Sequence, residues 1–170
     1  MKTFLLFLLL SSTVCFAQEK VSYQPTHQFI ITGNVKTEVI ISTDSLLTYP
    51  LKNIGNIKIT DHLGNLKHGD ENLKGVLLKD ILMHSQINST PHLFSQYYFV
   101  CTGSDGYKVV YSWNELFNTE IGEHVFIVLE KNGKKLADLP ESLQMVSMLD
   151  QTTGRRYLHN LEKISIEQAK

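Results

Sequence analysis

The chain has 170 residues, and its 16 lysine and arginine residues nearly balance its 17 aspartate and glutamate residues. This balance argues against a nucleic-acid partner and against attraction to an anionic membrane surface. The length suits one domain that buries enough apolar surface to fold without disulfide bridges.

The N-terminus has the pattern of a secretory signal peptide. One lysine precedes the apolar run 4–10, and small residues, Cys15 and Ala17, stand at the two positions that a signal peptidase reads. The run is too short for a bilayer, which takes about 20 apolar residues, so we expect no membrane span. Lipidation of Cys15 is the alternative, but Val14 is a poor residue ahead of a lipidated cysteine. We therefore expect a signal peptide over residues 1–17 and a protein that is periplasmic or secreted.

Processing after Ala17 would leave Cys101 as the single cysteine, which excludes an intramolecular disulfide. Cys101 ends the apolar run 97–101, which predicts a buried small side chain rather than a reactive thiol. The polar segment 18–28 predicts a flexible N-terminal arm. Residues 29–170 are then expected to form a single domain.

Short apolar and β-branched runs dominate the rest of the chain and predict strands. They lie at 29–32, 35–42, 57–60, 66–71, 97–101, 108–111, 125–130, 143–149 and 163–167, with a further strand from Leu136.

Helix signals occur at three places between these strands. A short helix is predicted from Thr43 and is ended by Pro50. A second is predicted over 75–82, where apolar residues share one helical face. The third opens with a capping box formed by Ser112 and Glu115. The pattern predicts an α+β fold, mainly β, with mixed sheets and short helices.

Six motifs follow one another in an order typical of a known family. They are Phe29–Val35, Gly75–Leu82, Ser104–Tyr107, Lys131–Gly133, Leu143–Val146 and Gly154–Leu161. In this order they resemble the sulfite-oxidase-type molybdopterin-binding domain of oxidoreductases. The resemblance extends from about Phe29 to Glu167, and it implies the fold of that domain.

One position departs from the family pattern. The resemblance implies a cysteine that binds molybdenum in a C-x-G-N turn, whereas the matching turn here runs from His62 to Asn65 and has histidine in place of the cysteine. A neutral imidazole is a poor replacement for a soft, anionic thiolate. Cys101 lies in a predicted strand and does not restore the site. We therefore expect no cofactor, and molybdopterin is implied by the resemblance alone.

Basic residues near Gly154 form the first candidate binding site. Arg155, Arg156 and His159 offer hydrogen-bond donors to a phosphate or another small anion. The alternative is that they are surface charges that pair with acids such as Asp150.

Two turns complete the candidate site. His62 and Asn65 belong to the turn that replaces the family's metal-binding turn, and Asp105 and Tyr107 border the family's site in the resemblance. The alternative is ordinary turn chemistry for Asp105 and a half-buried tyrosine on a strand for Tyr107.

A small metal site is a weaker hypothesis for the hairpin around the first of these turns. Asp61, His62 and His68 have carboxylate and imidazole groups suited to zinc or copper. The alternative is a polar hairpin tip in water.

Taken together, these patterns predict an exported, non-catalytic module that binds a small anion or a partner protein of the cell envelope. The alternative is a molybdopterin-dependent oxidoreductase, or a subunit of one, with an unusual ligand set.

Overall fold

The computed structural model describes residues 24–140 and 142–170. The predicted signal peptide and residues 18–23 of the predicted arm lie outside the described residues. The first strand begins at Gln28, one residue inside the predicted arm. In the described part of the chain, no helix has the length and apolar character needed to cross a membrane.

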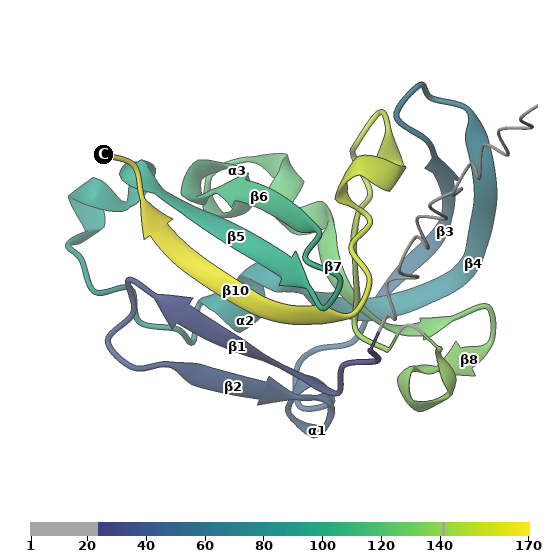
Figure 1. The fold of residues 1–170 in the computed structure, drawn as a ribbon, viewed down its shortest axis with the longest axis horizontal. Helices are drawn as coiled ribbons and strands as arrows, with labels where there is room; N and C mark the ends of the chain where they lie inside the picture. Colours follow the sequence, from purple (N-terminus) through teal and green to yellow (C-terminus); the bar gives the residue numbers. More distant parts are fainter. Residues whose placement is uncertain (1–23, 141) are drawn as a thin grey trace, which may run out of the picture.

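One five-stranded sheet has the strand order β2-β1-β10-β5-β6 (Figure 1). Its strands are β1 (Gln28–Gly33), β2 (Val39–Ser42), β5 (Tyr97–Gly103), β6 (Lys108–Ser112) and β10 (Leu161–Gln168). β1 and β10 run parallel, and the other neighbours run antiparallel. The first and last strands of the described chain therefore pair at the centre of this sheet.

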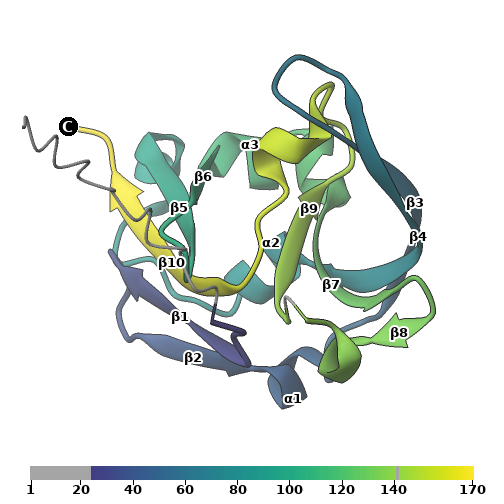
Figure 2. The same cartoon turned by 45° about the vertical axis from the view of Figure 1, so that its right-hand side comes forward.

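The second sheet has the order β3-β4-β7-β8, and β9 also pairs with β7. Its strands are β3 (Lys52–Thr60), β4 (Leu66–Leu77), β7 (Val125–Lys131), β8 (Lys134–Lys135) and β9 (Gln144–Ser147). All pairs are antiparallel. The long β3–β4 hairpin projects from the body of the molecule (Figures 1 and 2).

Short helices connect and cover the sheets, and α2 lies between them (Figure 2). The α-helices are α1 (Thr43–Leu46), α2 (Leu78–Leu82) and α3 (Trp113–Phe117). The 3-10 helices are η1 (Pro91–Gln96), η2 (Glu120–His124), η3 (Leu136–Asp138) and η4 (Thr153–Arg156). The predicted capping box is present at the start of α3, where Ser112 Oγ accepts a hydrogen bond from Glu115 N at 3.1 Å.

β7 separates two hydrophobic clusters. Val125 and Ile127 join the large cluster between the sheets, whereas Phe126 and Val128 join a smaller one under the β3–β4 hairpin. Alternate side chains of a strand point to opposite faces, so a strand buried on both faces is apolar at every position. This explains the unbroken apolar run that predicted β7.

The predicted α+β fold, mainly β with mixed sheets and short helices, is confirmed, but several boundaries were wrong. Gly75–Leu77 extends β4 instead of starting a helix, because these residues pair with β7. β2 begins only at Val39, and the predicted strand at Leu136 is the 3-10 helix η3. β3 begins at Lys52, well before the predicted start. Contacts between segments far apart in the sequence therefore determine where these elements begin and end, and the local sequence pattern does not show those contacts.

Candidate functional site

A pocket of about 360 Å³ lies where the β3–β4 hairpin, the β5–β6 turn and the η4 region meet. We call it the hairpin pocket. The hairpin and the η4 segment stand side by side (Figures 1 and 2). Five of the predicted ligand-binding residues line it: His62, Asp105, Tyr107, Arg155 and His159. Segments far apart in the sequence thus bring most of the predicted site together.

Two predicted ligand-binding residues do not line the pocket. The side-chain Nδ2 of Asn65 donates to Asp61 Oδ2 at 3.1 Å and so holds the hairpin turn. Arg156 Nε donates to Asp150 Oδ2 at 2.7 Å, and its guanidinium lies over the Tyr111 ring at 4.5 Å. Arg156 does not line the pocket with Arg155, because successive residues of a 3-10 helix point about 120° apart. Arg156 instead has the alternative role of an ion pair with Asp150.

The two carboxylates of the hairpin pocket are engaged by their own turns. Asp61 Oδ1 accepts from the amides of Leu63 and Asn65, at 2.8 and 2.9 Å. The hydrogen bond from the Asn65 side chain, followed by these amide bonds, lowers the pKa of Asp61. Asp105 Oδ1 accepts from Tyr107 N at 2.8 Å, as turn chemistry requires. The acids of the pocket therefore stabilise turns.

Cationic and imidazole groups make up much of the remaining polar lining. Lys67, Arg155 and the imidazoles of His62, His68 and His159 all border the hairpin pocket. Arg155 is held by its neighbours, because its NH2 group reaches His62 O at 3.4 Å and its carbonyl accepts from the Tyr107 hydroxyl at 2.7 Å. Hydrogen-bond donors of this kind suit an anion.

One buried oxygen in the pocket wall lacks a partner. Thr60 Oγ1 is inaccessible to solvent and has no hydrogen-bond partner in residues 24–140 and 142–170. Thr60 lines the hairpin pocket. A buried hydroxyl without a partner is uncommon and costly, but this oxygen has no surface open to the pocket and does not by itself indicate a ligand.

Close backbone contacts lock the walls of the pocket together. A Cβ atom at Gly154 would lie 2.1 Å from Thr60 O, and one at Gly103 would lie 2.6 Å from His159 O. Thr153 Oγ1 adds a hydrogen bond to Lys58 O at 2.6 Å. Glycine at both positions thus allows η4 to dock on β3 and the β5–β6 turn to dock on the start of β10.

A buried polar network lies directly behind the pocket. The Tyr157 hydroxyl accepts from Lys131 Nζ at 3.0 Å and lies 2.8 Å from Asp70 Oδ2 and 2.6 Å from Gln144 Oε1. The ring of Tyr157 lines the pocket and packs on His159, with ring centroids 4.5 Å apart. Sequence reasoning missed this network, because no spacing in the sequence pairs residues on β4, β7 and β9.

The candidate metal ligands do not converge. In the described residues, no group of three or more histidine, cysteine, aspartate or glutamate side chains could hold a metal ion. The Asp61 carboxylate accepts hydrogen bonds within its own turn. His68 Nε2 lies 3.7 Å from Asp70 Oδ2, on the side of the buried network. The geometry gives no support to a metal site formed by Asp61, His62 and His68.

The donor set of the hairpin pocket does not fit molybdenum bound through a thiolate. The position of the family's cysteine carries the His62 imidazole, and Cys101 does not line the pocket. Cys101 is fully buried in the core, and this burial raises the pKa of its thiol to about 12. A buried, protonated thiol is not a metal ligand.

Replacing Tyr157 by phenylalanine should lower the free energy of unfolding by about 1–3 kcal/mol, because Asp70 and Lys131 lose a buried hydrogen-bond partner. The exposed Tyr107→Phe variant, which loses a bond to the Arg155 carbonyl, is the matched control and should lose less than about 1 kcal/mol. Urea denaturation measures both. Equal losses would show that the network does not stabilise the fold.

Burial of Cys101 predicts a pH dependence of stability. The thiol pKa rises from 9.0 to about 12 on folding, so the unfolded chain releases the proton first as the pH increases. The protonated thiol therefore contributes fully to the free energy of unfolding at pH 8 and below. This contribution falls by about 1.4 kcal/mol between pH 8 and pH 10. Denaturation at both pH values should show that the Cys101→Ala variant lacks this part of the loss. The same loss in the variant would refute the assignment.

Comparison with known proteins supports the fold. No family model and no curated protein matches the sequence. Among solved structures, the chain is similar to the sulfane dehydrogenase SoxCD from Paracoccus pantotrophus, with a TM-score of 0.59 and 13% identity. The match covers 82% of this chain and 38% of that one, so the chain spans well under half of the enzyme chain it matches. The chain therefore has an α+β fold related to that of this dehydrogenase.

Proposed function

We propose that this protein is an exported, non-catalytic module that binds a small anion in the hairpin pocket. One observation carries the proposal: Arg155, Lys67 and three imidazoles line the pocket, while its two carboxylates accept hydrogen bonds from their own turns.

The lining favours a small oxyanion over a larger ligand. Arg155 supplies a planar set of donors that matches two oxygens of one anion, and Lys67 supplies a point charge. The volume of about 360 Å³ leaves room for such an anion together with several water molecules. A rigid wall, made by the close contact of Gly154 with Thr60, reduces the entropy lost on binding.

The absence of a thiolate from the pocket lining supports a role without molybdenum chemistry. The dehydrogenase with the related fold is a much longer chain, so its activity does not transfer to this one. We propose that the fold is retained here as a scaffold for binding.

Two alternatives have some support. The related fold favours a molybdopterin-dependent oxidoreductase, or a subunit of one, in which His62 would have to replace the cysteine. A partner protein of the cell envelope is favoured by Leu63 and Leu66, which are 73% and 63% exposed at the hairpin tip. The proposal of export, with a signal peptide over residues 1–17, rests on the sequence pattern.

Anion binding to the hairpin pocket should depend on Arg155. Titration of the mature protein with inorganic phosphate and with sulfate, followed by calorimetry, should show saturable binding to one site. Arg155→Gln should weaken that binding at least tenfold, because a charge-assisted hydrogen bond contributes about 1.5–3 kcal/mol.

The matched control removes one positive charge at a site outside the pocket. Lys163, exposed on β10, does not line the hairpin pocket, so Lys163→Gln should bind the anion as the parent protein does. Equal weakening in both variants would show a general charge effect and would contradict binding at the hairpin pocket. A lack of saturable binding by the parent protein would also contradict it.

A further inference from the structure

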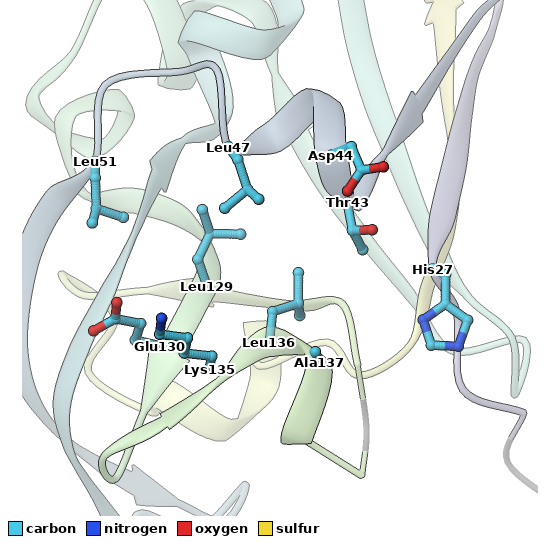
Figure 3. A pocket seen from close by; sticks show the side chains of 10 residues that line it. All are labelled: His27, Thr43, Asp44, Leu47, Leu51, Leu129, Glu130, Lys135, Leu136 and Ala137. Atoms are coloured by element: carbon cyan, nitrogen blue, oxygen red, sulfur yellow. The ribbon is translucent and has the colours of Figure 1, made fainter.

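A second cavity, of about 390 Å³, lies between α1, the start of β3, β7 and η3 (Figure 3). We call it the leucine cavity. It shares no lining residue with the hairpin pocket. Whatever binds in one cavity therefore does not touch the other.

Four leucines form the apolar part of this cavity and point toward a common space (Figure 3). Leu129 and Leu136 are buried, at 4% and 7% exposure, and form its floor. Leu47 and Leu51 stand above them and are 70% and 51% exposed. Exposed leucines beside a preformed apolar floor gain stability when a ligand covers them.

Polar groups occupy the two ends of the cavity (Figure 3). Asp44 lies at one end with Thr43, and Lys135 lies at the other beside Glu130. Glu130 is already paired with Lys74, since its Oε2 lies 2.6 Å from Lys74 Nζ. The His27 imidazole lies on the side of Thr43 and Asp44, so this end of the cavity offers several hydrogen-bonding groups to the polar end of a ligand.

We propose that the leucine cavity binds an amphipathic molecule with a hydrocarbon body and one hydrogen-bond-donating end, a hydroxyl or an amide. The body covers Leu47 and Leu51, and the polar end hydrogen-bonds with Thr43 and Asp44. The cavity holds about a dozen volumes of the size of water, at roughly 30 Å³ each, which sets the size of the ligand. A carboxylate at the polar end is disfavoured, because it would lie beside the Asp44 carboxylate and lose water without gaining a partner there.

Titration of the ¹⁵N-labelled mature protein with 1-octanol tests the assignment. Amide resonances of Leu129, Leu136 and Ala137 should shift to saturation, while those around Arg155 in the hairpin pocket stay unchanged. Octanoate, which has the same chain with a carboxylate end, should bind at least tenfold more weakly.

Filling the cavity should abolish the binding. Ala137 is exposed and lines the cavity, whereas its exposed neighbour Asp138 does not. Ala137→Phe should weaken octanol binding at least tenfold, and Asp138→Phe, with the same added side chain, should leave it unchanged.

A second pair of variants removes a wall without touching the core. Leu47→Ser should weaken octanol binding, whereas Leu63→Ser, at a leucine of similar exposure on the hairpin tip, should not. Shifts that do not saturate, equal binding by the members of either pair, or octanoate binding as tight as that of octanol would overturn the proposal.

Discussion

The hydroxyl group of Tyr157 joins β4, β7 and β9 to the segment that leads into β10. It contacts Lys131 and Asp70 inside the protein, where an unpaired charge costs several kcal/mol, so each group needs the others in place. Its ring faces the hairpin pocket. The buried charges thus fix the position of Tyr157 in the pocket wall. The close backbone contacts at Gly154 and Gly103 fix the neighbouring segments of the same wall.

Sequence alone predicted the fold class because the signals for it are local. The apolar run of β7 and the capping box at Ser112 depend on neighbours along the chain. The order of the motifs led to candidate residues such as His62 and Arg155, which the structure places at one pocket. The direction of Arg156 and the network around Tyr157 were missed, because both depend on contacts between residues far apart in the sequence. The same holds for the leucine cavity, whose walls come from four separate elements.

The ligands that the hairpin pocket can bind depend on which side chains line it. The single cysteine of the described residues is in the core, with a raised thiol pKa, and the pocket wall presents imidazole, ammonium and guanidinium groups. These groups bind anions well and hold a high-valent metal poorly. In our proposal, a fold related to that of a dehydrogenase carries an anion site in the hairpin pocket, and the separate leucine cavity holds an amphipathic molecule.

Analysis of the protein purified from cells that make molybdopterin tests the central claim most directly. Molybdenum content, the absorbance of a pterin and native mass spectrometry should be measured on the same mature sample. The account predicts no molybdenum above background and no pterin absorbance, with the chain carrying at most a small anion. One molybdenum per chain together with a pterin would contradict it, because a thiolate-free pocket would then hold the metal.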